Sequence, residues 1–179
     1  MRLRSQLFWV IAGLFVAVLL VILLVSTAGT RRYLEQQLAS HAQDAATALS
    51  ITLSQSLGKN DRVLAETQVL SMFDRGYFQR IDVLDTERKV IVARALPERI
   101  EEVPNWFVQL LPIQTPAGEA FVGSGWRQLG KVLVVSQPTY AYQHLWRTSW
   151  QLLAWLLAIC LAALLLLLLG LKLILKPLR

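Results

Sequence analysis

The sequence is short of the residues that build disulfides, hydrolytic sites and metal centres. It has one cysteine, Cys160, so no disulfide can form within the chain. A hydrolytic triad needs a base held beside a nucleophile and an orienting acid, and no motif joins either histidine, His41 or His144, to a serine. No glycine-rich phosphate loop follows a predicted strand. We therefore expect a chain that is not an enzyme.

A metal site is also poorly supported. His41 and Asp44 lie three residues apart in a helical pattern and could share a metal, but two potential ligands without a third or fourth are weak evidence. The plainer interpretation is a polar pair that faces solvent or a dimer partner. The carboxylates of the central segment are expected mostly in solvated turns and loops, and they are Asp82, Asp85, Glu87, Glu98, Glu101 and Glu102.

Charge is scarce as well, at 17% of residues against about 25% in an ordinary soluble domain. Apolar residues make up 55%, which excludes a disordered tail and argues against a cytosolic globule. The excess lies in two apolar runs, residues 7–25 and 152–171. At about 1.5 Å per residue, each run is long enough to cross the roughly 30 Å hydrocarbon layer of a bilayer. The sequence therefore predicts two transmembrane helices in contact with membrane lipid.

The basic residues set the expected orientation. All twelve acidic residues lie between Glu35 and Glu119, whereas Arg2 and Arg4 precede the first run and three bases follow the second. This pattern predicts that both termini lie in the cytoplasm. Arg31 and Arg32 argue against this orientation, because they follow the first run on the side expected outside the cytoplasm, but the basic residues at both termini outweigh them. The net charge of +6 is mostly membrane-flanking and gives no reason to expect nucleic acid.

The same runs divide the chain into five segments, and the protein is expected in the bacterial inner membrane. A cleaved signal peptide would have an apolar core of about 7–15 residues, and the first run is longer, so an uncleaved anchor is favoured. The expected segments are a cytoplasmic N-terminus (1–6), a first span (7–25), a periplasmic domain (26–151), a second span (152–171) and the start of a HAMP-like segment (172–179).

Hydrophobic periodicity predicts the fold class of the central segment. An apolar stripe at three- and four-residue steps predicts a long helix over 30–57, and Asn60 or Asp61 can cap a second helix through about Phe73. The predicted strands cover 77–84, 89–93, 120–122 and 131–135, with a short helix after Pro104. A final helix is predicted over 140–172. The order indicates an α+β, PAS-like periplasmic module with long helices continuous with the two transmembrane helices.

The tryptophans indicate a binding site. Four of the six lie within or beside the apolar runs and are expected as interfacial anchors, and Trp106 is most simply core. Trp126 is different, because Gly125 precedes it and Arg127 follows it in a glycine-rich segment, 123–130, predicted to be a loop. An exposed tryptophan next to arginine is typical of a binding hot spot, and the alternative is a ring folded back over the sheet as core.

Four segments and the chain's end resemble a known family. They are 40–49 in the first outer helix, 72–78, 103–107 and 123–127, followed by Lys176-Pro177-Leu178-Arg179, which resembles the entry to a HAMP domain. With the two spans, these residues resemble the N-terminal part of LapD-type cyclic di-GMP receptors, with their LapD/MoxY periplasmic domain. The resemblance covers essentially the whole chain.

The resemblance implies an inside-out signalling receptor that controls biofilm adhesion. In such receptors a HAMP segment, a degenerate GGDEF domain and an EAL domain follow, and the EAL domain binds cyclic di-GMP, so no cofactor is expected in this chain. The periplasmic output domains form intertwined homodimers that sequester LapG, a calcium-dependent cysteine protease that cuts a surface adhesin. An exposed tryptophan enters a pocket of the protease, and Trp126, with Gly125 and Arg127, matches that position.

Two other functions remain open. One is a periplasmic small-molecule sensor domain in front of a diguanylate cyclase, a phosphodiesterase or a histidine kinase, which has the same two spans and binds its ligand in a pocket of convergent polar groups. The other is a dimerising anchor without an external partner, which a buried Trp126 would favour.

Overall fold

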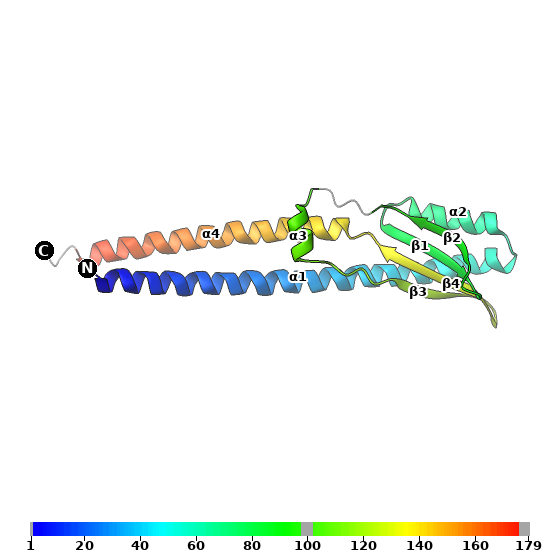
Figure 1. The fold of residues 1–179 in the computed structure, drawn as a ribbon, viewed down its shortest axis with the longest axis horizontal. Helices are drawn as coiled ribbons and strands as arrows, with labels where there is room; N and C mark the ends of the chain where they lie inside the picture. The colour runs from blue at the N-terminus through cyan, green and yellow to red at the C-terminus, as the bar shows by residue number, and fades with distance from the viewer. Residues whose placement is uncertain (1, 98–101, 176–179) are drawn as a thin grey trace. The chain divides into compact units, whose positions relative to one another are not determined.

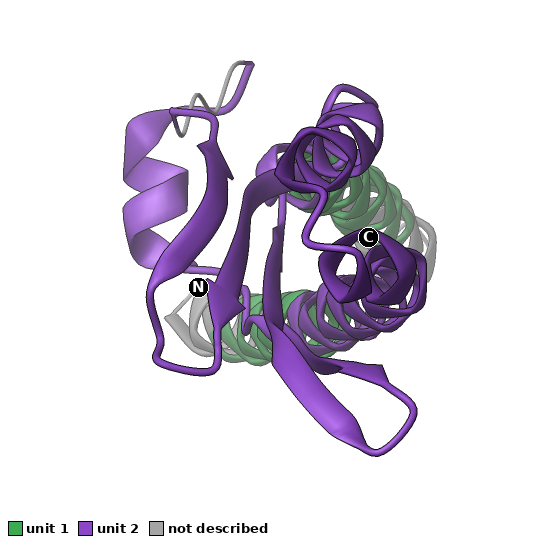
Figure 2. Ribbon diagram, turned by 90° about the vertical axis from the view of Figure 1, so that its right-hand side faces the viewer, with its two compact units in different colours: residues 1–30, 144–179 green, residues 31–143 purple. Residues whose placement is uncertain are grey.

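The computed structural model describes residues 2–97 and 102–175, and it divides the chain into two compact units. One unit comprises residues 31–143, and the other comprises residues 1–30 together with 144–179. Figure 1 shows the order of the helices and strands, and Figure 2 shows the two units in different colours. The unit of residues 31–143 contains the whole sheet.

Two helices precede the sheet. Helix α1 (Arg2–Gly58) is one continuous helix, and α2 (Arg62–Phe73) follows after a short turn. Asp61 caps α2, because its carboxylate accepts a hydrogen bond of 3.0 Å from the backbone N–H of Leu64. Asn60 has a φ of 59°, a left-handed conformation that asparagine tolerates better than most residues. The predicted helix pair and its cap are therefore confirmed.

The sheet has four antiparallel strands in the order β2-β1-β4-β3. The strands are β1 (Phe78–Asp85), β2 (Val90–Ala95), β3 (Gly118–Ser124) and β4 (Arg127–Ser136). Val83 in the central strand β1 pairs with Val92 on one side and Val132 on the other. The short helix α3 (Asn105–Leu110) lies in the connection between β2 and β3. The α+β class predicted from periodicity is confirmed.

The core fills the space between one face of the sheet and the two helices α1 and α2. Leu53 of α1, Val69 of α2 and Ile81 of β1 are all fully buried within it. Each such side chain contributes about 1.5–3 kcal/mol through the apolar surface that it removes from water. The apolar stripe predicted on α1 is the face that packs here, and Figure 2 shows the helices beside the sheet in purple.

Two predictions about this unit are wrong. Asp82, expected on a solvated face, is 6% exposed, because the central strand places it between two neighbours and Arg80 Nε lies 2.6 Å from its Oδ2. The segment 123–130, expected to be a loop, is almost entirely strand, since β3 and β4 extend into it and leave only residues 125 and 126 in the turn. Glu98 and Glu101 lie outside the described residues.

The second unit consists of helical segments. It contains the first part of α1 and most of α4 (Thr139–Leu175), and both helices are long and apolar enough to cross a membrane by length and composition. Large apolar side chains such as Leu14, Leu24 and Trp155 are 67–70% exposed, as expected for surfaces that lipid would cover. The end of the HAMP-like segment, residues 176–179, lies outside the described residues.

Candidate partner-binding hairpin

The strands β3 and β4 form a hairpin whose turn carries the predicted site. Ser124 pairs with Arg127, so the turn is two residues long and consists of Gly125 and Trp126. Gly125 has a φ of 62°, and the first residue of a tight two-residue hairpin turn requires such a positive φ, which glycine adopts without strain. In Figure 1 the turn projects beyond the other strands of the sheet.

The side chain of Trp126 is almost completely free of the rest of the chain. It is 95% exposed, and Gly125 and Arg127 beside it are exposed too. The alternative in which the ring packs over the sheet as core is therefore wrong for this structure. A tryptophan so exposed is unusual, because burying its large ring is ordinarily favourable. The three residues predicted for partner binding thus lie together at the tip of the hairpin.

The outer face of the same hairpin carries a second exposed aromatic residue, Phe121. Its side chain is 67% exposed. Lys131, which pairs with it across the strands, places its Nζ 5.8 Å from the centre of the ring and 2.5 Å from Oε2 of Glu119. A cation over an aromatic face stabilises the pair by about 0.5–1 kcal/mol at exposed sites. The ring of Phe121 is therefore supported by its neighbours while it remains open to solvent.

The base of the hairpin is fixed to helix α1. The side-chain amide of Gln43 donates a hydrogen bond of 2.8 Å to the carbonyl of Glu119 and accepts one of 3.1 Å from the N–H of Glu119. One residue earlier in the strand, a Cβ on Gly118 would lie only 2.2 Å from the backbone carbon of Ala42. At the distal end, Gly58 of α1 lies beside Ser124. Helix α1 therefore contacts strand β3 at both of its ends, most closely at Gly118.

Gln43 and Gly118 were not predicted as site residues. The contact of Gln43 with Glu119 spans 76 residues of sequence. No local pattern signals such a contact. Gly118 lies before the strand predicted over 120–122, and the structure places it at the start of β3.

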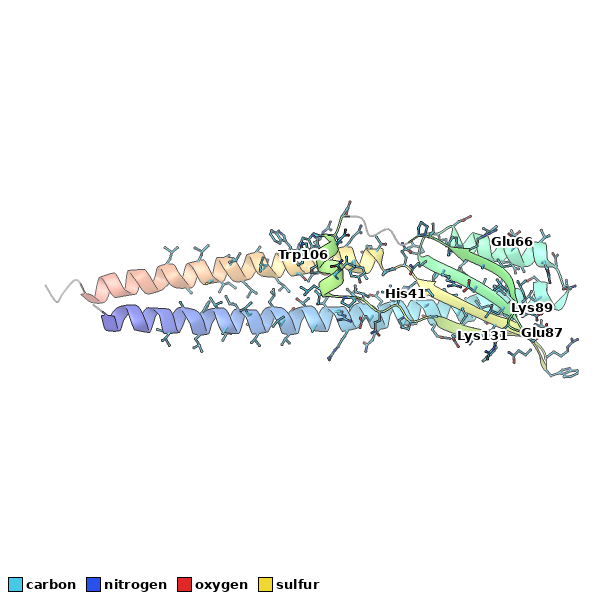
Figure 3. All side chains as sticks on the ribbon, in the orientation of Figure 1. His41, Glu66, Glu87, Lys89, Trp106 and Lys131 are labelled. Carbon is cyan, nitrogen blue, oxygen red and sulfur yellow. The ribbon has the colours of Figure 1, made fainter. Side chains whose placement is uncertain are left out.

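The other candidate residues do not form a site. His41, labelled in Figure 3, and Asp44 are exposed on α1. The described part of the chain contains no group of three or more potential metal-ligating residues. Trp106, predicted as core, is 59% exposed, whereas its neighbour Phe107 is 5% exposed. The short helix α3 buries Phe107 instead, and the two rings meet edge to face with their centres 5.8 Å apart. The prediction for Trp106 is therefore wrong.

The structure thus combines an antiparallel sheet that has helices on one face with an exposed hairpin tip. It also has two helices that are long and apolar enough to cross a membrane by length and composition, which places it in the class of α+β domains with candidate membrane anchors. The sequence matches the LapD/MoxY periplasmic domain family over residues 23–146, and the chain belongs to this family. As a member of this family, it is a periplasmic signalling receptor domain. With two apolar helices, the family assignment indicates a protein of the inner membrane.

A solved structure is also similar. The LapD periplasmic domain of Pseudomonas fluorescens is 40% identical, and the match covers 70% of this chain and 98% of that one, with a TM-score of 0.40. No curated protein sequence matches the chain.

Proposed function

We propose that this chain is the membrane-spanning front of a cyclic di-GMP receptor, and that its periplasmic domain captures a LapG-type protease through Trp126. The observation that carries the proposal is the 95% exposure of Trp126 at the tip of a hairpin in a domain of the LapD/MoxY family. The resemblance assigns the protease contact to this position. The geometry supports it, because a ring that the domain does not bury is available to a pocket on another protein.

The hairpin suits this role because the ring is presented on fixed backbone. The ladder pair of Ser124 with Arg127 closes the turn directly below Trp126, and Gln43 ties the base of β3 to α1. An anchor that is already ordered loses less conformational entropy when it binds. Removing such an aromatic anchor typically costs at least about 2 kcal/mol, or roughly thirtyfold in affinity.

The remaining parts of the proposed function concern the membrane and the cytoplasm. The apolar runs 7–25 and 152–171 are proposed as two spans with both termini in the cytoplasm, and the periplasmic domains are proposed to form an intertwined homodimer. Cyclic di-GMP would bind a cytoplasmic EAL domain outside this chain, and the resulting change in the periplasmic dimer would favour capture of the protease. Captured protease could not cut the surface adhesin, so that cells stay attached in a biofilm.

The test is capture of a purified LapG-type protease by the full chain in detergent micelles. Trp126→Glu should weaken capture at least about thirtyfold. Tyr77→Glu is the matched control, because Tyr77 is also a strongly exposed aromatic residue, at 72%. It lies before β1, next to the end of β4 that is farther from the Gly125-Trp126 turn. Capture should survive the control substitution. Undiminished capture by the Trp126→Glu variant would refute the assignment of this residue.

A further inference from the structure

Strand β3 is an edge of the sheet, and the Gln43 contact shows which way its backbone groups point. In the order β2-β1-β4-β3, β3 is paired on one side only, with β4. Both the N–H and the C=O of Glu119 bond to Gln43 rather than to β4. The backbone groups of Glu119 therefore point to the free edge. The side-chain amide of Gln43 makes the two hydrogen bonds that a neighbouring strand would make.

Two further residues of β3 direct their backbone groups to the free edge. Residues two apart in a strand direct their backbone groups to the same side, so those of Phe121 and Gly123 also point away from β4. Among the described residues, no hydrogen bond to these groups on the free edge is found, and both residues are exposed. The edge is therefore closed at Glu119 by Gln43 and open at Phe121 and Gly123, immediately before the Gly125-Trp126 turn.

We propose that this open edge, the backbone of Phe121 and Gly123, binds an extended segment of the protease as an added β-strand. The inference rests on the proposed function, because its occupant is the protein that Trp126 anchors. Proteins ordinarily protect exposed strand edges, since a free row of donors and acceptors pairs with other chains. In this domain Gln43 protects the edge at Glu119, whereas the edge next to the Gly125-Trp126 turn is unprotected. Main-chain hydrogen bonds of this kind supply affinity, while neighbouring side chains supply specificity. Phe121 within the open edge and Trp126 in the turn after it both have exposed aromatic side chains.

A second copy of this chain fits the edge less well. Antiparallel pairing of Phe121 with Gly123 of a second copy would also set the Gly125-Trp126 turn opposite residues 119 and 118 of that copy. The edge at residue 119 is occupied, because Gln43 of α1 already makes both hydrogen bonds to Glu119. A single extended peptide carries no such helix and can follow the edge as far as the turn.

The test uses hydrogen exchange and one pair of variants in the full chain. In wild-type protein alone, the amides of Phe121 and Gly123 should exchange fast, and both should become protected when the purified LapG-type protease is added. Gly123→Pro removes one edge N–H but no bond to β4, and should weaken capture at least about tenfold. Gly123→Ala keeps the N–H, and within the chain its Cβ would meet only the carbonyl of Arg127 at 3.5 Å, so it should weaken capture less than Gly123→Pro does.

The outcomes separate this inference from the proposed function. If protease is captured through Trp126 but the two amides gain no protection, the edge inference is wrong and the proposed function stands. If no protease is captured at all, the proposed function fails first. Protection that appears without protease and rises with chain concentration would show a second copy on the edge and would also overturn the inference. The exchange measurement does not depend on the folding of the proline variant.

Discussion

The tight contact between β3 and α1 predicts that a single methyl group will destabilise the periplasmic domain. In Gly118→Ala, the new Cβ would lie 2.2 Å from the backbone carbon of Ala42, 2.3 Å from its oxygen and 2.4 Å from the nitrogen of Gln43. Carbon atoms pack at about 3.5–4.0 Å, so the helix and strand would have to separate by more than about 1 Å. The obstacle is backbone on both sides, and no side-chain rotation relieves it.

The expected cost follows from two contributions. Overpacking of this kind typically costs about 1–3 kcal/mol. Separation would also break the two hydrogen bonds between Gln43 and Glu119, each of which contributes about 1 kcal/mol. The free energy of unfolding should therefore fall by about 3–5 kcal/mol, a large part of the roughly 5–15 kcal/mol that stabilises a typical domain.

Urea titration with brief proteolysis of the full chain in micelles measures this effect on the unit of residues 31–143. With m of about 1–3 kcal/mol per M for a small protein, the unfolding midpoint of Gly118→Ala should fall by roughly 1–5 M. Gly123→Ala, in the same strand, is the matched control, because its nearest contact is the carbonyl of Arg127 at 3.5 Å. Equal midpoints for the two variants would show that α1 and β3 do not pack as closely as described.

Three further predictions test the same unit. Gln43→Ala should accelerate hydrogen exchange at the amide of Glu119 and lower stability by about 1–2 kcal/mol, because both hydrogen bonds to that residue are lost. Leu53→Ala should lower the free energy of unfolding, measured by urea titration, by about 2–5 kcal/mol, because Leu53 is fully buried. Ile51→Ala, at a position 68% exposed on the same helix, should change that free energy by less than about 0.5 kcal/mol. Asp61→Ala should lower the free energy of unfolding by about 1 kcal/mol, because it removes the N-cap of α2. A urea unfolding midpoint equal to that of the wild type would refute the role of Asp61 as a cap.

The elements that depend on local pattern were predictable from the sequence. The stripe on α1 repeats at helical spacing over many residues, and its apolar members, among them Leu49 and Leu53, are those that pack in the core. The cap at Asp61 and the alternation around Ile81 are likewise local signals. The order of helices and strands therefore follows from the sequence.

Features set by the environment of a residue were predicted poorly. Asp82 alternates with apolar neighbours and was expected in solvent, but its position in a central strand and the side chain of Arg80 bury it. Trp106 was expected in the core because it lies among apolar residues on a short helix, but α3 buries Phe107 and leaves Trp106 59% exposed. The glycines at 123 and 130 suggested a loop, because glycine is disfavoured in strands unless another backbone comes close. At Gly130 it does, since a Cβ there would lie 2.3 Å from the carbonyl oxygen of Leu84.

The glycines and Gln43 together explain how the hairpin can present Trp126 without help from the ring itself. Trp126 contributes almost no buried surface, so the position of the tip must be set by contacts below it. Gly118 lets α1 approach β3, Gly130 lets β4 approach β1, and Gln43 bonds the strand to the helix at the point of closest approach. Each contact joins residues that are distant in sequence, so none is visible in a local pattern. The exposed ring is therefore free to serve an interface, because the stability of the hairpin does not depend on it.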